Sequence, residues 1–401
     1  MSELTIGEVY RAQMVLKDVA RHPKIIGPTA LSDKCHIYLK PENLQYTGSF
    51  KLRGAYYKIS QLSDEEKKRG VIACSAGNHA QGVALGATHN GIKSLICLPA
   101  GAPISKIEAT KRLGAEVCLV PGVYDDAYAK ALELKEKHGY TFVHPFDDPL
   151  VIAGQGTIGI EIVEEMPDVE AVVVPVGGGG LISGVAFAVK TLRPDIKVYG
   201  VQAEGAPSMV KSLACDKREH LATVSTIADG IAVKEPGVNT FEFCKKYVDD
   251  IVTVNDDEIA AAILALIEKQ KLVAEGAGAT AVAAAMFGKL PVDGKKVVCL
   301  VSGGNIDVNT LNRIINRGLG KAGRLCTLEL EAADKPGTLS AVLKIVGEEG
   351  GNILGVNHER VASATTDINS CLLHLELETL NNSHIARIKK SLQKAGYRVI
   401  E

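Results

Sequence analysis

The sequence lacks both a strong excess of charge and a long apolar run, and these two absences limit the partners it can have. The 401 residues carry a formal net charge of −2, so no bulk attraction toward nucleic acid or an anionic membrane is expected. No apolar run reaches the roughly 18 residues of a membrane-spanning helix. The acidic start of the chain lacks a signal peptide's charged-then-apolar layout. We therefore expect no nucleic-acid partner and no membrane partner.

The nine cysteines include no CxxC pair, the spacing most typical of zinc and redox sites. Several lie inside apolar, strand-like runs such as VIACS and VVCLVSG. This scatter indicates reduced core residues, not a disulfide or zinc framework, and it predicts a cytoplasmic protein. Hydrophobic residues make up 46% and charged residues 23%, which is ordinary for a globular chain of two or three domains.

Short β-branched runs alternate with helical patterns over most of the chain. The strand-like runs lie at 36–39, 70–75, 94–99, 116–120, 171–176, 197–203, 250–254 and 296–303. Helical stretches separate most of them, which predicts an α/β fold with largely parallel sheets. Residues 36–145 could hold one sheet and residues 150–315 another.

The composition changes at 316–324, where the stretch NRGLGKAGR is small, basic and glycine-containing. Such a composition is typical of a linker. Beyond it, residues 325–401 follow the order strand, helix, strand, strand, helix, strand. This βαββαβ order is the ferredoxin-like arrangement, and it predicts a separate small domain.

Four stretches share one design, in which an apolar strand is followed by a tight turn and then a helix. They are TGSFKLRGA (47–55), SAGNHAQG (75–82), GGGGLISG (177–184) and SGGNIDVN (302–309). A helix N-terminus binds anions through its free N–H groups and its positive dipole end. Because the strand ends of an open parallel sheet face one crevice, we expect a small ligand with more than one anionic group.

The four consecutive glycines of GGGGLISG indicate a phosphate-binding loop. The alternative is a turn made only for packing, although such a run weakens both helix and strand. The stretch is not a dinucleotide fingerprint, because Ile182 or Ser183 stands where the last glycine of GxGxxG is needed. Glu204 ends the next strand as a ribose-binding acid would, so a nicotinamide-dependent dehydrogenase remains an alternative.

Lys51 stands in the first turn of a predicted helix, between Phe50 and Leu52 and near Arg53. Burial, a positive helix end and a neighbouring cation would each lower the pKa of the lysine and leave a free amine. A nucleophilic amine, a phosphate loop and small polar loops together suit pyridoxal phosphate. A solvated surface lysine is the alternative.

The loop SAGNHAQG follows a strand and opens a helix with free N–H groups. Ser75 and Asn78 are small polar residues suited to a carboxylate or a ring hydroxyl, and a simple N-cap is the alternative. The position of His79 favours a helix residue whose ring nitrogens are hydrogen-bonded, not an acid–base catalyst.

The four motifs, in this order and spacing, resemble the threonine dehydratase (threonine ammonia-lyase) family of fold type II pyridoxal-phosphate enzymes. The tail resembles an ACT domain, a regulatory module, so the likeness covers essentially the whole chain. It implies a tryptophan synthase β-like catalytic region of two subdomains. The implied boundaries are 1–320 for that region, with a small subdomain at about 41–145 inserted between 1–40 and 146–315, then a linker at 316–324 and the ACT domain at 325–401.

The resemblance also implies a role for individual residues. Lys51 would be the catalytic lysine that holds the cofactor, Phe50 would stack beside its ring, and Ser302 would face the pyridine nitrogen. Asn78 would bond the ring hydroxyl, and Glu275 would lie on the cofactor side, with a simple acid at a helix start as its alternative. The residues implied in phosphate binding are Gly177, Gly178, Gly179, Gly180 and Leu181. Those implied in binding the substrate carboxylate are Ser75, Ala76, Gly77, Asn78 and His79.

The activity that the resemblance implies is β-elimination of L-threonine to 2-oxobutanoate and ammonia, with L-serine as a second substrate, in isoleucine biosynthesis or threonine catabolism. Related racemases have a serine where this chain has Ala76, and they bind a divalent ion through a glutamate and an aspartate six residues later. This chain has Glu204 and Val210 there, so we expect poor racemisation and no such metal site. A serine dehydratase or racemase remains an alternative, as does a non-catalytic amino-acid sensor.

The stretch DKPGTLSAV (334–342) begins the first helix of the tail. An ordinary capped helix is one interpretation. The ACT resemblance implies instead that Asp334, Pro336 and Gly337 bind an amino-acid effector such as isoleucine or valine. We also expect a homotetramer or a homodimer.

Overall fold

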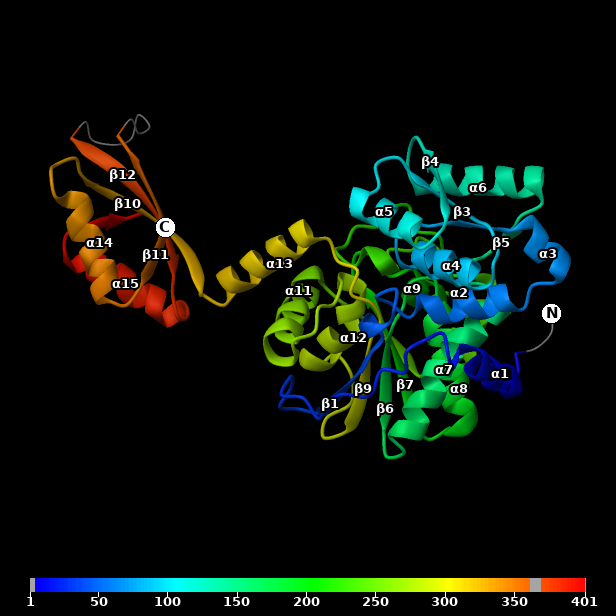
Figure 1. Ribbon diagram of the computed structural model, residues 1–401. Helices are drawn as coiled ribbons and strands as arrows, with labels where there is room; N and C mark the ends of the chain where they lie inside the picture. The colour runs from blue at the N-terminus through cyan, green and yellow to red at the C-terminus, as the bar shows by residue number, and fades with distance from the viewer. Residues whose placement is uncertain (1–3, 361–368, 401) are drawn as a thin grey trace. The chain divides into compact units, whose positions relative to one another are not determined.

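The structure, a computed structural model, describes residues 4–360 and 369–400 and divides into two compact units, Met1–Ile306 and Asp307–Glu401 (Figure 1). The division precedes residue 320, where we expected the catalytic region to end. The predicted linker at 316–324 is mostly helical, because α13 runs over Val308–Lys321. Asp307 caps this helix by accepting from the N–H groups of Asn309 and Thr310. At Gly320 a side chain would meet nothing within 4 Å, so packing does not require a glycine there.

The larger sheet of the first unit has five strands, all parallel, in the order β1-β9-β6-β7-β8. The strands are β1 (His36–Pro41), β6 (Ala171–Pro175), β7 (Lys197–Ala203), β8 (Asp250–Val254) and β9 (Lys296–Val301). Helix α12 (Gly276–Met286) packs on β6, β7, β8 and β9, while α8 (Gly180–Leu192) packs on β6 and β7. Helices on both faces explain why the central strands β6 and β9 are nearly continuous apolar runs.

The smaller sheet has four parallel strands in the order β4-β3-β2-β5. They are β2 (Val71–Cys74), β3 (Ser94–Pro99), β4 (Glu116–Val120) and β5 (Thr141–Phe142). Helix α4 (Asn78–His89) packs with Val71 and Ala73, and α6 (Tyr124–His138) packs with Ile72 and Cys74, so the two helices cover opposite faces. The strand predicted at 36–39 is β1 of the larger sheet, so the expectation of one sheet over 36–145 was wrong.

Eleven further helical segments lie in the described part of the first unit. They are α1 (Ile6–Leu16), η1 (Glu42–Leu44), α2 (Lys51–Ser60), α3 (Asp64–Arg69), α5 (Ile104–Arg112), α7 (Pro149–Glu165), α9 (Ser208–Ala214), η2 (Asp229–Ile231) and α10 (Val238–Tyr247), with α11 (Asp256–Ala265) and η3 (Leu266–Gln270) before α12. Within the described parts of the chain, no helix combines the length and the apolarity needed to span a bilayer.

Helices α2, α7 and α8 approach one another closely because glycines lie at their crossings. A Cβ atom on Gly184 of α8 would lie 2.3 Å from the carbonyl oxygen of Ile152 on α7. A Cβ on Gly154 of α7 would lie 2.6 Å from the Cα of Gly54 on α2. The close contacts set the position of α2, whose first residue is Lys51.

We predict that Gly184→Ala lowers the free energy of unfolding by about 1–3 kcal/mol, because the added methyl group has no space between the helices. The matched control is Gly7→Ala in α1, where the nearest atom would lie at 3.8 Å, an ordinary contact distance. That change should raise the free energy of unfolding by up to about 1 kcal/mol. Chemical denaturation of the two variants measures both effects, and equal changes would contradict the packing argument.

The second unit forms a four-stranded antiparallel sheet in the order β11-β12-β10-β13. Its strands are β10 (Leu325–Ala333), β11 (Asn352–Glu359), β12 (Ser370–Glu378) and β13 (Arg398–Val399), and its two sheet-packing helices are α14 (Thr338–Glu348) and α15 (Asn382–Lys394). Alternate residues of β10 and β12, such as Leu330 and Leu373, form one core with Val342 and Ile388 of the helices. The predicted βαββαβ order is confirmed.

Candidate active site

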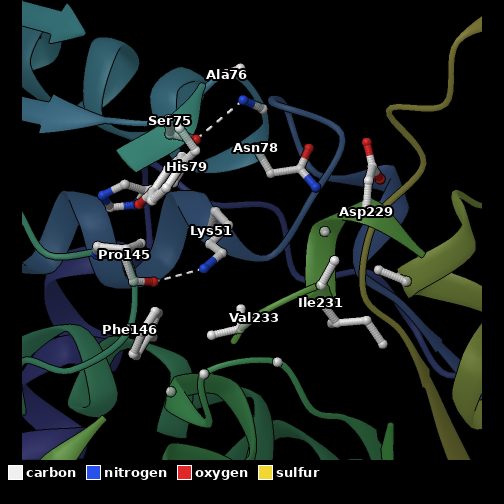
Figure 2. A pocket seen from close by; sticks show the side chains of 18 of the residues that line it. Lys51, Ser75, Ala76, Asn78, His79, Pro145, Phe146, Asp229, Ile231 and Val233 are labelled. Carbon is white, nitrogen blue, oxygen red and sulfur yellow. Dashed lines mark hydrogen bonds between the residues drawn. The ribbon is translucent and has the colours of Figure 1, made fainter. Parts of the chain in front are cut away.

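A cavity of about 960 Å³ contains every site residue that the sequence predicted in the first unit. These residues follow the ends of β2, β6 and β9 or begin α2 and α12. They are Phe50, Lys51, Ser75–His79, Gly177–Leu181, Glu275 and Ser302. Figure 2 shows the Lys51 amine pointing into the space between the Ser75–His79 loop and the apolar side chains of Phe146, Ile231 and Val233.

Sequence reasoning missed part of the cavity lining. Pro145 and Phe146 follow β5, which has only two residues and therefore no recognisable strand pattern. The segment 229–233 (DGIAV) includes only the short helix η2. A glycine after an aspartate signals a turn, but it does not indicate that the turn returns to this cavity.

Lys51 has a partly buried amine whose pKa is lowered, which is the direction expected from its position. Its Nζ donates a hydrogen bond to the carbonyl oxygen of Pro145 at 2.7 Å and lies 5.2 Å from the centre of the Phe50 ring. Burial lowers the pKa of Lys51 to about 8, and the negative charge of Glu275 opposes this shift. A substantial fraction of the lysine is therefore neutral near physiological pH.

Arg53 does not act on Lys51 as the sequence suggested. Its guanidinium is buried in ion pairs with Glu42 at 2.8 Å and Glu161 at 2.5 Å. Glu161 also binds Lys40 at 2.8 Å. Because two carboxylates neutralise the arginine, its charge does not contribute to the lowered pKa of the lysine.

A chain of side-chain hydrogen bonds connects four of the loops around the cavity. Asn78 Nδ2 donates to Glu275 Oε1 at 2.7 Å, and Asn78 Oδ1 accepts from Asn305 Nδ2 at 2.5 Å. Asn305 Nδ2 also donates to the carbonyl oxygen of Thr47 at 2.8 Å. Burial raises the pKa of Glu275 to about 7, and Asp229 adds to this shift. Glu275 is therefore more than an exposed acid at the start of a helix.

We predict that Glu275→Gln becomes more stable relative to the wild type as the pH rises from about 4.5 to 7. The folded-state pKa is raised, so the stabilising contribution of Glu275 is complete below its unfolded value of 4.5 and is lost as the pH passes about 7. The difference corresponds to at most about 3 kcal/mol. Glutamine keeps the oxygen that accepts from Asn78.

The measurement is urea denaturation of both proteins, freed of cofactor, at pH 5 and pH 8. As a control, Glu108→Gln on α5 should show no such trend, because Glu108 is exposed and pairs only with Lys111. A stability difference between wild type and Glu275→Gln that does not change with pH would contradict the raised pKa.

Backbone bonds join the loop before Lys51 to the loop after β9. The N–H of Phe50 donates to the carbonyl oxygen of Ser302 at 3.1 Å, and the N–H of Gly304 donates to that of Gly48 at 2.9 Å. The N–H of Glu275 donates to Gly303 at 3.0 Å. Ser302 is thereby held beside the start of α2.

The glycines at 178–180 are required by close packing, and the loop that they form can also bind a ligand. Gly179 has a φ of 98°, a left-handed conformation that favours glycine. A Cβ on Gly178 would lie 2.5 Å from the ring of Phe146, and one on Gly180 would lie 2.7 Å from the Phe146 carbonyl oxygen. Protein neighbours alone therefore require these glycines. The first N–H groups of α8 still have no partner within the helix, and the loop lines the cavity, so it suits a phosphate group.

The loop Ser75–His79 combines an uncapped helix start with a buried histidine. The N-cap position of α4 is Gly77, and no side chain caps the helix, so its first N–H groups remain available. The ring Nε2 of His79 contacts the carbonyl oxygen of Val143 at 2.8 Å, and burial lowers the pKa of His79 to about 3. His79 is therefore neutral, as the sequence favoured.

Residues 24–303 match the model of one family, described as pyridoxal-phosphate dependent enzyme. The chain belongs to this family. An L-threonine ammonia-lyase of Thermotoga maritima is 54% identical over 398 residues, which cover 99% of each chain. A second L-threonine ammonia-lyase, from Geobacter sulfurreducens, is 44% identical over 386 residues and 96% of each chain.

Solved structures give the same answer for the fold. A threonine deaminase isoform 2 from Solanum lycopersicum has a TM-score of 0.73 and 40% identity, covering 78% of this chain and 94% of that one. A maize serine racemase also has a TM-score of 0.73, with 33% identity over 79% of this chain and 98% of that one. The predicted fold type II architecture is confirmed, and the fold by itself does not separate the two reactions.

The cofactor of this family is pyridoxal phosphate, and the residues of the cavity fit it. They offer a lysine amine whose lowered pKa makes its neutral form accessible, and two helix N-termini that suit anions. The nicotinamide alternative has no comparable support, because Glu204 is exposed and is not among the described residues that line the cavity.

Proposed function

We propose that this enzyme is an L-threonine ammonia-lyase, which converts L-threonine to 2-oxobutanoate and ammonia. The observation that carries the proposal is the buried Lys51 amine, whose pKa is lowered to about 8, in a cavity that also contains the glycine loop. The similarity to L-threonine ammonia-lyases over nearly the whole chain supports the same substrate. L-Serine should react as well, because one methyl group is worth only about 1–3 kcal/mol of discrimination.

Each part of the cavity has a separate task in this proposal. Pyridoxal phosphate, when bound, supplies an electron sink for cleavage at the substrate Cα. Lys51 would hold the cofactor and would act as the base that takes the Cα proton. The N–H groups of the Ser75–His79 loop bind the substrate carboxylate, and the Gly177–Leu181 loop binds the phosphate. Phe146, Ile231 and Val233 give the cavity an apolar wall.

Two residues favour elimination over racemisation. Ser302 would offer a hydroxyl to the ring nitrogen of the bound cofactor, and a hydroxyl would not keep that nitrogen charged as an aspartate would, which would favour elimination over a long-lived carbanion. Ala76 lines the cavity and has no group that could return a proton from the other side of the substrate. Racemisation is therefore a poor activity in this proposal. Dehydration of L-serine is a secondary activity beside that of L-threonine.

We predict that Lys51→Ala lowers the rate of 2-oxobutanoate release by at least about a hundredfold, because the general base is lost. Borohydride reduction followed by mass spectrometry should find the cofactor attached to Lys51 in the wild type and no attachment in the variant. Lys67→Ala in α3 is the control, since Lys67 is partly exposed and lies 3.9 Å from Asp64.

Ammonia release from threonine at the wild-type rate by Lys51→Ala would overturn the proposal. Chiral analysis of the serine reaction tests the racemase alternative in the same preparations. D-Serine formed as fast as pyruvate would show that Ala76 does not prevent return of the proton.

We further propose that the second unit is an ACT domain that binds an amino-acid effector, with isoleucine as the first candidate and valine as the second. Asp334, Pro336 and Gly337 line a cavity of about 390 Å³ beside the start of α14. A free carboxylate suits the N-terminus of this helix, and Asp334 suits the ammonium group of the same ligand. In this proposal the enzyme lies upstream of isoleucine synthesis or in threonine catabolism.

We predict that Asp334→Asn raises the isoleucine concentration needed for half of the regulatory effect by about tenfold, because a charge-assisted hydrogen bond is lost. The measurement is 2-oxobutanoate release against isoleucine concentration, with a chelator present. Glu329→Gln on β10 is the control, because Glu329 lies outside the residues that line this cavity. An unchanged response in Asp334→Asn would show that the effector does not bind in this cavity.

The remaining proposals concern the environment of the protein and its assembly. All nine cysteines are free, and six of them are buried, which supports a reducing, cytoplasmic location. Strand β11 pairs only with β12 among the described strands and exposes Leu354 and Val356. An unpaired strand edge of this kind supports a homodimer or homotetramer.

A further inference from the structure

The second unit contains a group of three side chains that differ in chemistry and converge on one point. The carboxylate of Asp334, the imidazole of His358 and the thiol of Cys371 each place one ligand atom within 4.8 Å of the other two. All three line the cavity of about 390 Å³. Within residues 4–360 and 369–400, no other group of this kind occurs.

The register of the sheet brings these residues together. Cys371 of β12 pairs with Ala332 of β10, and Leu373, two residues later, pairs with His358 of β11. Alternate residues of a strand share one face, and directly paired residues lie on the same face. Cys371 and His358 therefore lie on one face. Asp334, two residues beyond Ala332, continues that face just past the end of β10.

We propose that Asp334, His358 and Cys371 bind a zinc ion or a similar transition metal ion, with the fourth position left to water or a small anion. Carboxylate, imidazole and thiolate are all zinc ligands, whereas magnesium and calcium prefer oxygen alone. Two ligands at typical zinc distances in a tetrahedron lie roughly 3.3–3.8 Å apart. The 3.9 Å from His358 Nε2 to Asp334 Oδ1 is already close to this range.

The ion must displace the present partners of these groups. Arg360 lies 3.3 Å from Asp334, but its side chain is 71% exposed and can turn into solvent. Cys371 Sγ lies 3.4 Å from the carbonyl oxygen of Ala332, to which the thiol donates, and metal binding releases this proton. The positive N-terminal end of α14, which begins at Thr338, opposes a bare cation. An anion at the fourth position of the metal would lie between the ion and that helix end and remove the conflict.

This inference does not depend on the proposed lyase activity. It shares Asp334 with the proposed effector site, so the metal is tested without amino acids. The full-length holoenzyme is reduced with a phosphine, treated with a chelator and dialysed. Zinc is then titrated by calorimetry, and bound zinc is measured after gel filtration.

The wild type should bind a single zinc ion per chain at this site. Cys371→Ser and His358→Gln should each weaken binding by at least about tenfold, because each removes a direct ligand. Two matched controls should bind as the wild type does. Cys215→Ser removes an exposed thiol, and His374→Gln removes a histidine of β12 that lies near Glu329 and Glu359. Magnesium should not bind.

Equal affinity in the wild type and in both ligand variants would overturn the proposal, as would loss of binding in Cys215→Ser. Cys371 is buried, so its variant could fail to fold. His358→Gln then decides, because the histidine side chain is 29% exposed and its loss leaves the core intact. Zinc should raise the thermal unfolding midpoint of the wild type and leave that of His358→Gln unchanged.

Discussion

The burial of one lysine amine without a direct carboxylate partner is the constraint on which this catalytic unit depends. Lys51 donates only to the carbonyl oxygen of Pro145 in the bonds that the structure defines, and burial brings its pKa down to about 8. The nearby carboxyl of Glu275 is shifted the other way, to about 7. Burial thus shifts the pKa of each group toward its uncharged form. The N-termini of α4 and α8, which line the same cavity without side-chain caps, add positive dipole ends that suit anions.

Holding such an amine in place requires a rigid support, and the sequence supplies it away from the cavity. Glycines let α2 lie against α7, and α7 against α8, at distances that no larger side chain would allow. Two residues after Lys51, Arg53 anchors α2 through its ion pairs with Glu42 and Glu161. Breaking a buried ion pair of this kind leaves an uncompensated charge, which is far more costly than losing a surface pair. The chemistry and its support therefore lie on the same helix.

Patterns within one element were readable from the sequence, and contacts between distant segments were not. The runs of β-branched residues predicted β6, β7 and β9, because strands buried on both faces need apolar residues throughout. The two residues of β5 are too few for any pattern, so Phe146 was missed. Contact with Phe146 also gives the glycine run a packing role beside the predicted phosphate binding. Phe146 requires glycine at 178 whether or not a phosphate binds, and only the folded chain shows this.

The cavity of the second unit also brings together side chains from distant segments, which the sequence could not predict. Sequence reasoning finds metal sites by short spacings such as CxxC, but Asp334, His358 and Cys371 are joined only by the register of three strands. Their surroundings restrict what can bind. Asp334 favours a positive centre, while the N-terminal end of α14 favours a negative one. A ligand that satisfies both must combine the two charges, as an amino acid does in one molecule and as a metal ion does together with a coordinated anion.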